Sequence, residues 1–261
     1  MTLEKYCDIE NETLLSISIK KRFNSTVYGM AHGMATCTAG DVKSILSDLS
    51  EKTILDKKNN KQLSPVELLK RCAPLALVFG DEFSFLDIVS FIEEYFSKNN
   101  INKTQFLGVF IFINIMFRLY YFDDFQRAFD ETINDCKKHI PAEYKSEFAA
   151  YEQFFNKQFQ SRPDKEYNTN GFQYYLLAAA YCCINQDSYE KTIKTVGIFT
   201  PDSDVISSMA GAMAGLYYYK NDGFPKELLA GQECEKYLDS LLTKFYKICK
   251  LASLSKKGDR G

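Results

Sequence analysis

The sequence predicts an all-α protein organised as a single domain, and three observations support this. Apolar residues recur at three-to-four spacing in most segments, which is the period of one helix face. Alternating strand patterns are nearly absent, and no internal repeat or convincing linker divides the chain. We therefore expect one helical domain over residues 1–254 and a flexible tail at 255–261.

The individual helices are expected from this periodicity and from residues that begin or end helices. Ser64, Pro65 and Glu67 fit the N-cap, first and third positions of a helix, and Pro141 ends another. Helices are expected at 11–23, 39–53, 64–80, 83–99, 103–121, 123–140, 142–158, 172–185 and 188–199, from Val205 onward, and at 225–254. The polar stretch 160–171 is expected to be a loop, and the Gly/Met-rich stretch 28–37 a flexible turn.

Composition narrows the possible partners and the compartment. The chain has 32 Lys and Arg against 34 Asp and Glu, with a net charge of −2, which disfavours a dedicated nucleic-acid surface. Its eight cysteines are scattered, and the N-terminus lacks a signal-peptide pattern, so we expect reduced thiols in the cytoplasm. The apolar stretch 106–122 is short for a bilayer span and contains Asn114 and Arg118. We expect it to be a buried helix and the protein to have no membrane partner.

The stretch "TPDSDVISSMAGAMAGLYYYKND" (200–222) contains the strongest candidate site. Asp202 and Asp204 precede an apolar helix, and capping explains one carboxylate there. Two carboxylates are harder to explain by capping. With the first outside helical geometry, both can converge on one point and bind Mg²⁺ or Ca²⁺, which prefer oxygen ligands. Both interpretations, cap and metal site, stay open at this point.

The same helix carries a face of small residues. Ala210, Gly211, Ala214 and Gly215 follow one another at i, i+1, i+4 and i+5. Glycine in a helix costs about 1 kcal/mol relative to alanine, so its use here indicates that another backbone approaches closely. We expect this helix to be central to the domain.

The stretch "PDSDVISSMAGAMAGLYYYKNDGFPKELL" resembles the C-terminal signature of the ADP-ribosylglycohydrolase family, which includes the dinitrogenase-reductase-activating glycohydrolases. That signature has a Gly-Gly-Asp-x-Asp-Thr turn, a small-residue helix and a proline that opens the next helix. Matching positions here are Asp202, Asp204, Gly211, Gly215, Tyr217, Tyr218 and Pro225. The stretch "LLKRCAPLALVF" is similar to the family's Met-Arg-x-x-Pro helix, with Arg71 and Pro74 in place. "CDIENETLLSISI" stands where the family has a Thr-Asp-Asp-Thr metal motif.

The resemblance implies an all-helical orthogonal bundle with a dinuclear Mg²⁺ or Mn²⁺ centre. The implied activity is hydrolysis of the bond between ADP-ribose and a modified acceptor residue. The implied metal ligands are Asp202 and Asp204, with Glu10 and Asn11 from the first motif. ADP-ribose or an ADP-ribosylated protein is the implied partner, while the resemblance assigns no catalytic residue and no oligomeric state.

Several family positions differ in this chain. Val205 replaces the threonine after the second aspartate, and Thr200-Pro201 replaces Gly-Gly. The chain begins about eight residues before the assigned first motif, so the family's N-terminal segment, with its Gly-Asp-Ala-x-Gly helix and catalytic glutamate, is expected to be missing. These differences leave two hypotheses. The protein is a divergent hydrolase at a degraded metal site with one ion or none, or an inactive pseudoenzyme that binds ADP-ribose, an ADP-ribosylated protein or a protein partner.

Other candidate residues have simpler structural interpretations. His32 is expected to be a surface or capped residue, and the cysteines buried thiols. Tyr217 to Tyr219 are expected to pack against neighbouring helices, although they could stack on an adenine. The pair Asp123-Asp124 is expected to cap the next helix.

Overall fold

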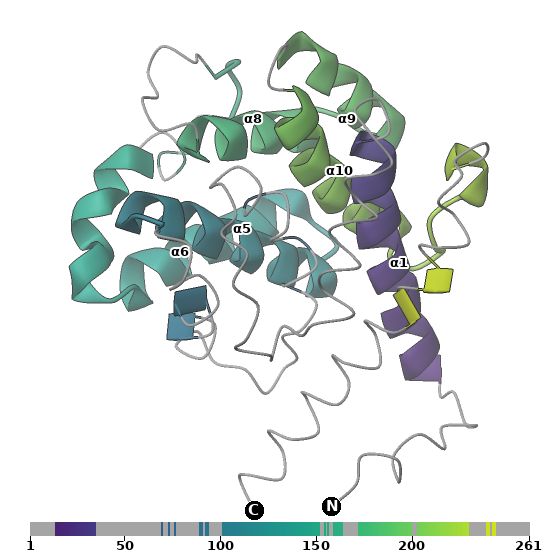
Figure 1. Cartoon of the computed structure of the whole chain (residues 1–261), viewed down its shortest axis with the longest axis horizontal. Helices are drawn as coiled ribbons and strands as arrows, with labels where there is room; N and C mark the ends of the chain where they lie inside the picture. The colour runs from purple at the N-terminus through teal and green to yellow at the C-terminus, as the bar shows by residue number, and fades with distance from the viewer. Residues whose placement is uncertain are drawn as a thin grey trace, which may run out of the picture.

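A computed structural model describes part of the chain, namely residues 14–34, 69, 73, 76, 89–90, 92–93, 101–151, 154, 156, 159–163, 172–199, 203–229, 239–240 and 242–243. Within these residues the helices are α1 (Leu14–Met34), α5 (Lys103–Tyr121), α6 (Phe125–His139), η3 (Ala142–Tyr151), α8 (Phe172–Ile184), α9 (Tyr189–Val196), η5 (Gly197–Phe199), α10 (Ser203–Tyr219) and η6 (Lys226–Leu229), where η marks a 3₁₀ helix. No strand occurs among the residues described. The all-α prediction is confirmed for this part of the chain (Figure 1).

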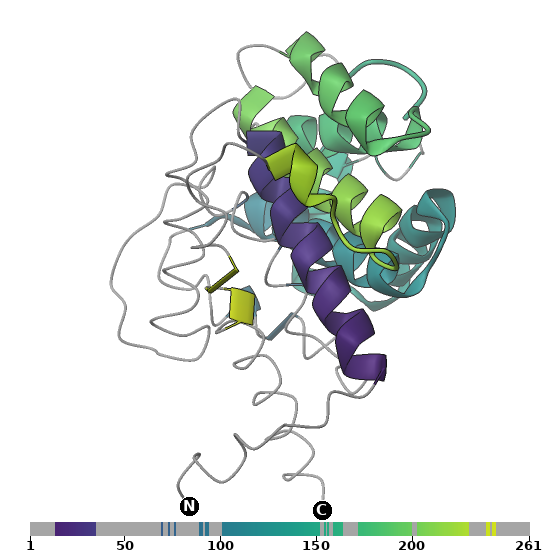
Figure 2. The same cartoon turned by 90° about the vertical axis from the view of Figure 1, so that its right-hand side faces the viewer.

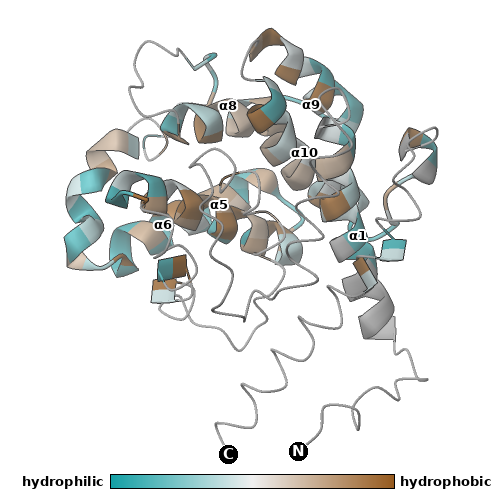
Figure 3. Ribbon diagram, in the orientation of Figure 1, coloured by the Kyte–Doolittle hydropathy of each residue, from teal (hydrophilic) through white to brown (hydrophobic). Residues whose placement is uncertain are grey.

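Helix α5 lies in the core of the described residues. It is buried almost without interruption from Phe106 to Met116, and its apolar character is visible in the middle of the molecule (Figure 3). By length and composition it could cross a membrane, but 67% of its most apolar window is buried inside the protein. The expectation of a buried helix at 106–122 is confirmed.

Short polar residues begin several helices. The Asn102 side chain accepts a hydrogen bond from Gln105 N at 2.9 Å, and the Gln105 side chain accepts one from Asn102 N at 3.0 Å. This reciprocal capping box satisfies two helix-end N–H groups that would otherwise lack partners. Asp124 caps α6 by accepting from Arg127 N at 3.0 Å, as predicted. Asp123 differs from the prediction, because it forms an ion pair with Lys220 instead.

The flexible turn expected at 28–37 is wrong where the structure describes this stretch. Helix α1 continues through Met34, so Gly29 and Gly33 are helical and buried. Glycine in a short stretch indicates flexibility when read alone, but here it permits close packing against another helix. The remaining residues of the stretch, 35–37, lie outside the described part.

The stretch 142–158 differs in type from the expected α-helix. Residues Ala142–Tyr151 form the 3₁₀ helix η3, which packs against the first turns of α5. The Tyr144 ring stacks on Phe106 with the ring centroids 4.5 Å apart, and the Tyr151 hydroxyl donates to Thr104 O at 2.6 Å. These two tyrosine anchors are tertiary contacts and leave no periodic signal in the sequence.

Three other expected helices, at 64–80, 83–99 and 225–254, are described only at scattered positions. The positions described inside 64–80 and 83–99 are α-helical, and Leu69, Ala73 and Ala76 are buried at four- and three-residue spacing. Within 225–254, Pro225 is not helical, Lys226–Leu229 form the 3₁₀ helix η6, and residues 239–240 and 242–243 are α-helical. The expected helix at 39–53 lies outside the described residues, as does the tail at 255–261.

Candidate metal centre

Helix α10 begins at Ser203, and Asp204 lies in its first turn with a partly buried side chain. The first turn of a helix has free N–H groups and a partial positive charge, so a carboxylate is stabilised there. The Ser207 hydroxyl donates to Asp204 O at 3.0 Å. Val205, the next residue, is only 3% exposed and belongs to the core. The side chain at 204 can therefore reach solvent, whereas the side chain at 205 cannot.

The other three predicted metal ligands, Asp202, Glu10 and Asn11, lie outside the described residues. Among the residues that are described, no group of three or more His, Cys, Asp or Glu side chains is arranged to hold a metal ion. The structure thus places one of the four predicted ligands, and the assembled site stays a prediction.

Helix α10 packs against α1 through glycines on both helices. A Cβ atom added at Gly29 would lie 2.7 Å from the Cα of Gly215, and one at Gly215 would lie 2.8 Å from the Cα of Gly29. A Cβ at Gly33 would lie 3.3 Å from the Cα of Gly211 and closer still to the carbonyl oxygen of Ser207. Contacts below 3.0 Å require the backbone to move, so these glycines allow an approach that side chains would prevent.

The two helices run antiparallel along this contact. Gly33 near the end of α1 meets Ser207 near the start of α10, while Ser25 meets Gly215 in the second half of α10. The Ser25 hydroxyl also donates to Tyr219 O at 2.7 Å. Figures 1 and 2 show α1 lying along α10 in both views. The last turn of α1 therefore lies beside the first half of α10, where Gly33 contacts Ser207.

His32, on the same half of α1, is held by α9. The buried Tyr189 hydroxyl donates to Gly29 O at 3.0 Å, and His32 Nδ1 lies 3.1 Å from the same hydroxyl oxygen. Burial lowers the pKa of His32, and the nearby Glu190 carboxylate opposes that shift. The expectation was a surface or capped residue, and the structure shows a partly buried His32 whose Nδ1 contacts the Tyr189 hydroxyl.

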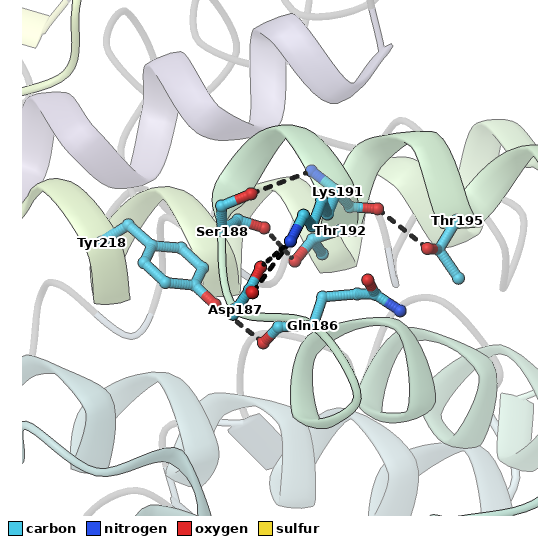
Figure 4. Close-up of polar contacts among 7 residues, drawn as sticks. All are labelled: Gln186, Asp187, Ser188, Lys191, Thr192, Thr195 and Tyr218. Atoms are coloured by element: carbon cyan, nitrogen blue, oxygen red, sulfur yellow. Dashed lines mark hydrogen bonds and ion pairs between the residues drawn. The ribbon is translucent and has the colours of Figure 1, made fainter.

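The three tyrosines at the end of α10 pack against neighbouring helices, as expected. The Tyr217 ring lies 4.0 Å from the Phe125 ring, and the Tyr219 hydroxyl donates to Glu190 at 3.0 Å. The Tyr218 hydroxyl donates to Gln186 O at 3.0 Å in the turn between α8 and α9 (Figure 4). In the same turn Ser188 caps α9 and Lys191 pairs with Asp187. These contacts stabilise the turn and leave the tyrosine hydroxyls engaged.

The described cysteines fit the expectation of buried thiols. Cys136, Cys182 and Cys183 are free and buried. Burial raises the pKa of each thiol, that of Cys182 to about 12. Because the thiolate is the nucleophilic form, these three residues are poor nucleophiles at neutral pH.

A comparison with protein families tests the family resemblance that the motifs around Asp202 and Asp204 suggested. The sequence profile of the ADP-ribosylglycohydrolase family matches residues 20–255. The chain belongs to the ADP-ribosylglycohydrolase family. No curated protein matches the chain in a separate search. The ADP-ribosylglycohydrolase match supports the all-helical fold of that family.

The extent of the ADP-ribosylglycohydrolase match also bears on the first metal motif. The matched region begins at residue 20, so Glu10 and Asn11 precede it, whereas most of α1 lies inside it. The motif quoted from the sequence, "CDIENETLLSISI", covers α1 only up to residue 19, whereas the match includes residues 20–34. A signal was available, because Gly29 and Gly33 repeat the four-residue spacing of Gly211 and Gly215.

Proposed function

We propose that the protein is a divergent ADP-ribosylglycohydrolase-like hydrolase that releases ADP-ribose from modified proteins. Its metal site consists of Asp202 and Asp204, with Glu10 and Asn11 as further ligands, and holds Mg²⁺ or Mn²⁺. The observation that supports this best is Asp204, a partly exposed carboxylate in the first turn of the glycine-packed α10, within the family match. Carboxylate and amide oxygens suit a hard cation, so the proposed residues fit the ion.

The chain's own groups have distinct roles in this proposal. A bound cation supplies Lewis-acid chemistry that orients sugar hydroxyls and water at the anomeric carbon. The Asp204 carboxylate holds that cation at the start of α10. The free N–H groups of the first turn favour negative charge, which suits the diphosphate of ADP-ribose. We propose a cytoplasmic location, where ADP-ribosylated proteins are available as substrates.

Loss of hydrolysis on removing one carboxylate tests this proposal. The purified protein is incubated with ADP-ribosylated protein and Mg²⁺ or Mn²⁺, and free ADP-ribose is measured by mass spectrometry. We expect release by the unaltered protein, and none by Asp202→Ala or Asp204→Asn. Asp222→Asn is the matched control, because Asp222 is an exposed acid beyond the other end of α10. Absence of release at high protein concentration contradicts the hydrolase proposal.

A second candidate function, binding without catalysis, is favoured by a different observation. Val205 stands where the family has a ligating threonine, and it is buried in the core. The change from threonine to valine removes an oxygen ligand from a site that requires oxygen atoms.

Calorimetry distinguishes this second function from the first. ADP-ribose is titrated into the protein with and without Mg²⁺, and the same protein is assayed for release of ADP-ribose. Heat of binding without any release identifies a binding protein. No heat in either condition leaves only a role in binding a protein partner.

A further inference from the structure

The short helix η5 anchors the chain just before the proposed metal ligands. Its last residue, Phe199, is 1% exposed. The Phe199 ring lies 6.2 Å from the Tyr174 ring and 6.0 Å from the Tyr181 ring, both on α8. Edge-to-face contacts of this kind stabilise an aromatic cluster. The end of η5 is therefore held in a fixed place on α8.

Arg162 covers this anchor from the polar stretch that precedes α8. Its Nη2 donates a hydrogen bond to Ile198 O at 2.6 Å. Its Cζ lies 5.3 Å from the centroid of the Phe199 ring, which is within the range of a cation–π contact. A planar guanidinium can make both contacts at once, and its charge strengthens the hydrogen bond.

The anchor lies immediately before the segment that bears the proposed ligands. Only three residues, 200–202, separate Phe199 from Ser203, the first residue of α10. Helix η5 also packs directly against α10, so a fixed η5 restrains α10, whose first turn carries Asp204.

We propose that Arg162 is a positioning residue that holds η5 and, through η5, the start of α10 with the carboxylate of Asp204. Arg162 is distant from α10 in sequence and acts through its contacts with Ile198 and Phe199. It does not contact substrate. Its effect on a bound ion depends on the proposed metal site, whereas its effect on the segment does not. These two effects can be measured separately.

Hydrogen exchange tests the effect on the segment without any metal. Arg162→Ala is compared with the unaltered protein, and exchange is followed by mass spectrometry in peptides covering 197–206. A charge-assisted hydrogen bond and a cation–π contact are lost, so we expect exchange there to accelerate roughly tenfold. Arg127→Ala is the matched control, because Arg127 lies over the Phe122 ring at 4.3 Å in another part of the fold. It should leave 197–206 unchanged. Unchanged exchange in Arg162→Ala overturns the proposal.

Mn²⁺ binding, measured by electron paramagnetic resonance, tests the consequence for the ligands. We expect Arg162→Ala to weaken Mn²⁺ binding about tenfold, with a melting temperature no lower than that of Arg127→Ala. Arg162→Lys keeps a cation and a donor for Ile198 O, so it should restore part of the affinity. If the unaltered protein binds no Mn²⁺, the metal part of the proposed function fails, and hydrogen exchange alone decides the role of Arg162. Equal Mn²⁺ affinity in all variants of a binding protein contradicts the positioning role.

Discussion

At the scale of single residues, the buried hydroxyl of Tyr189 determines the state of His32. The one phenolic hydrogen is donated to Gly29 O, so the hydrogen between Tyr189 and His32 must come from His32 Nδ1. Neutral His32 therefore carries its hydrogen on Nδ1 and leaves Nε2 as an acceptor. No pattern in the sequence predicts this arrangement, because the three residues are brought together by α1 and α9.

His32 makes the stability of the fold depend on pH. Burial lowers its pKa below the usual 6.5, so below pH 6.5 the unfolded chain binds more protons than the folded one. Stability should then fall as the pH falls through 6.5 toward the folded-state pKa. We expect His32→Gln to reduce this loss, as measured by urea unfolding at several pH values between about 5 and 8. His139→Gln keeps His32 and should retain the full loss. A pH profile identical in His32→Gln contradicts this prediction.

At the scale of elements, small residues and buried polar groups decide which helices pair. The Ala/Gly face of α10 predicts a close helix partner, and the structure identifies that partner as α1. Periodicity predicts most helices here because it reflects burial of one face. Periodicity does not predict the 3₁₀ helix η3, in which Tyr144 and Tyr151 contact α5. It also does not predict the helix at residues 28–34, where glycines allow close packing against α10.

The glycine contact makes a specific prediction for Gly211→Ala. The added Cβ would lie 3.3 Å from the Cα of Gly33 and closer still to the Gly29 carbonyl oxygen. Overpacking of this kind costs about 1–3 kcal/mol, and the gain in helix propensity, about 1 kcal/mol, offsets only part of it. Chemical denaturation should show net destabilisation. Gly197→Ala is the control, since nothing lies within 4 Å of the added Cβ, and it should be neutral or stabilising by roughly 0.5 kcal/mol.

Lys220 joins the end of α10 to the end of α5. Its ammonium group, only 3% exposed, donates to Leu119 O at 2.9 Å and to Phe122 O, and pairs with Asp123 at 2.8 Å. Cations near a helix C-terminus are favourable, and α5 ends at Tyr121. The buried ammonium group therefore stabilises the contact between the two helix ends.

We expect Lys220→Met to lower the free energy of unfolding by about 2 kcal/mol, because hydrogen bonds from a buried charge are lost. Urea unfolding followed by circular dichroism measures this. Lys191→Met removes an exposed pair with Asp187 and should give no resolvable change. Equal effects of the two substitutions would show that the buried position of Lys220 adds nothing.

At the scale of the whole molecule, an apolar core among the described residues connects helices that are distant in sequence. Buried residues from α1, α5, α6, α8 and α10 form a single cluster. A shared core favours cooperative unfolding. The expectation of one domain over 1–254, made from the absence of a repeat or linker in the sequence, stays a prediction.

Three buried thiols can report this cooperativity. Cys136 lies on α6, and Cys182 and Cys183 lie on α8. In pulsed alkylation with site-resolved mass spectrometry, all three should become reactive at the urea concentration where circular dichroism reports loss of helix. If the Cys136 thiol on α6 and the Cys182 and Cys183 thiols on α8 became reactive at clearly different urea concentrations, a single cooperative unit would be rejected.

The sequence by itself determined the helical class, most helix positions, and the family signature around Asp202 and Asp204, because these depend on local periodicity and on short motifs. Only the tertiary structure showed that the glycines of α10 pack against α1 and that residues 28–34 are helical. It also showed that Arg162 contacts Ile198 and Phe199. Such contacts join residues far apart in the chain, and their energies depend on distances that no local pattern records. The carboxylate pair that suggested a metal site is therefore a local signal. Asp204, the described member of the pair, lies on α10, and α10 is positioned by its contacts with α1, α8 and η5.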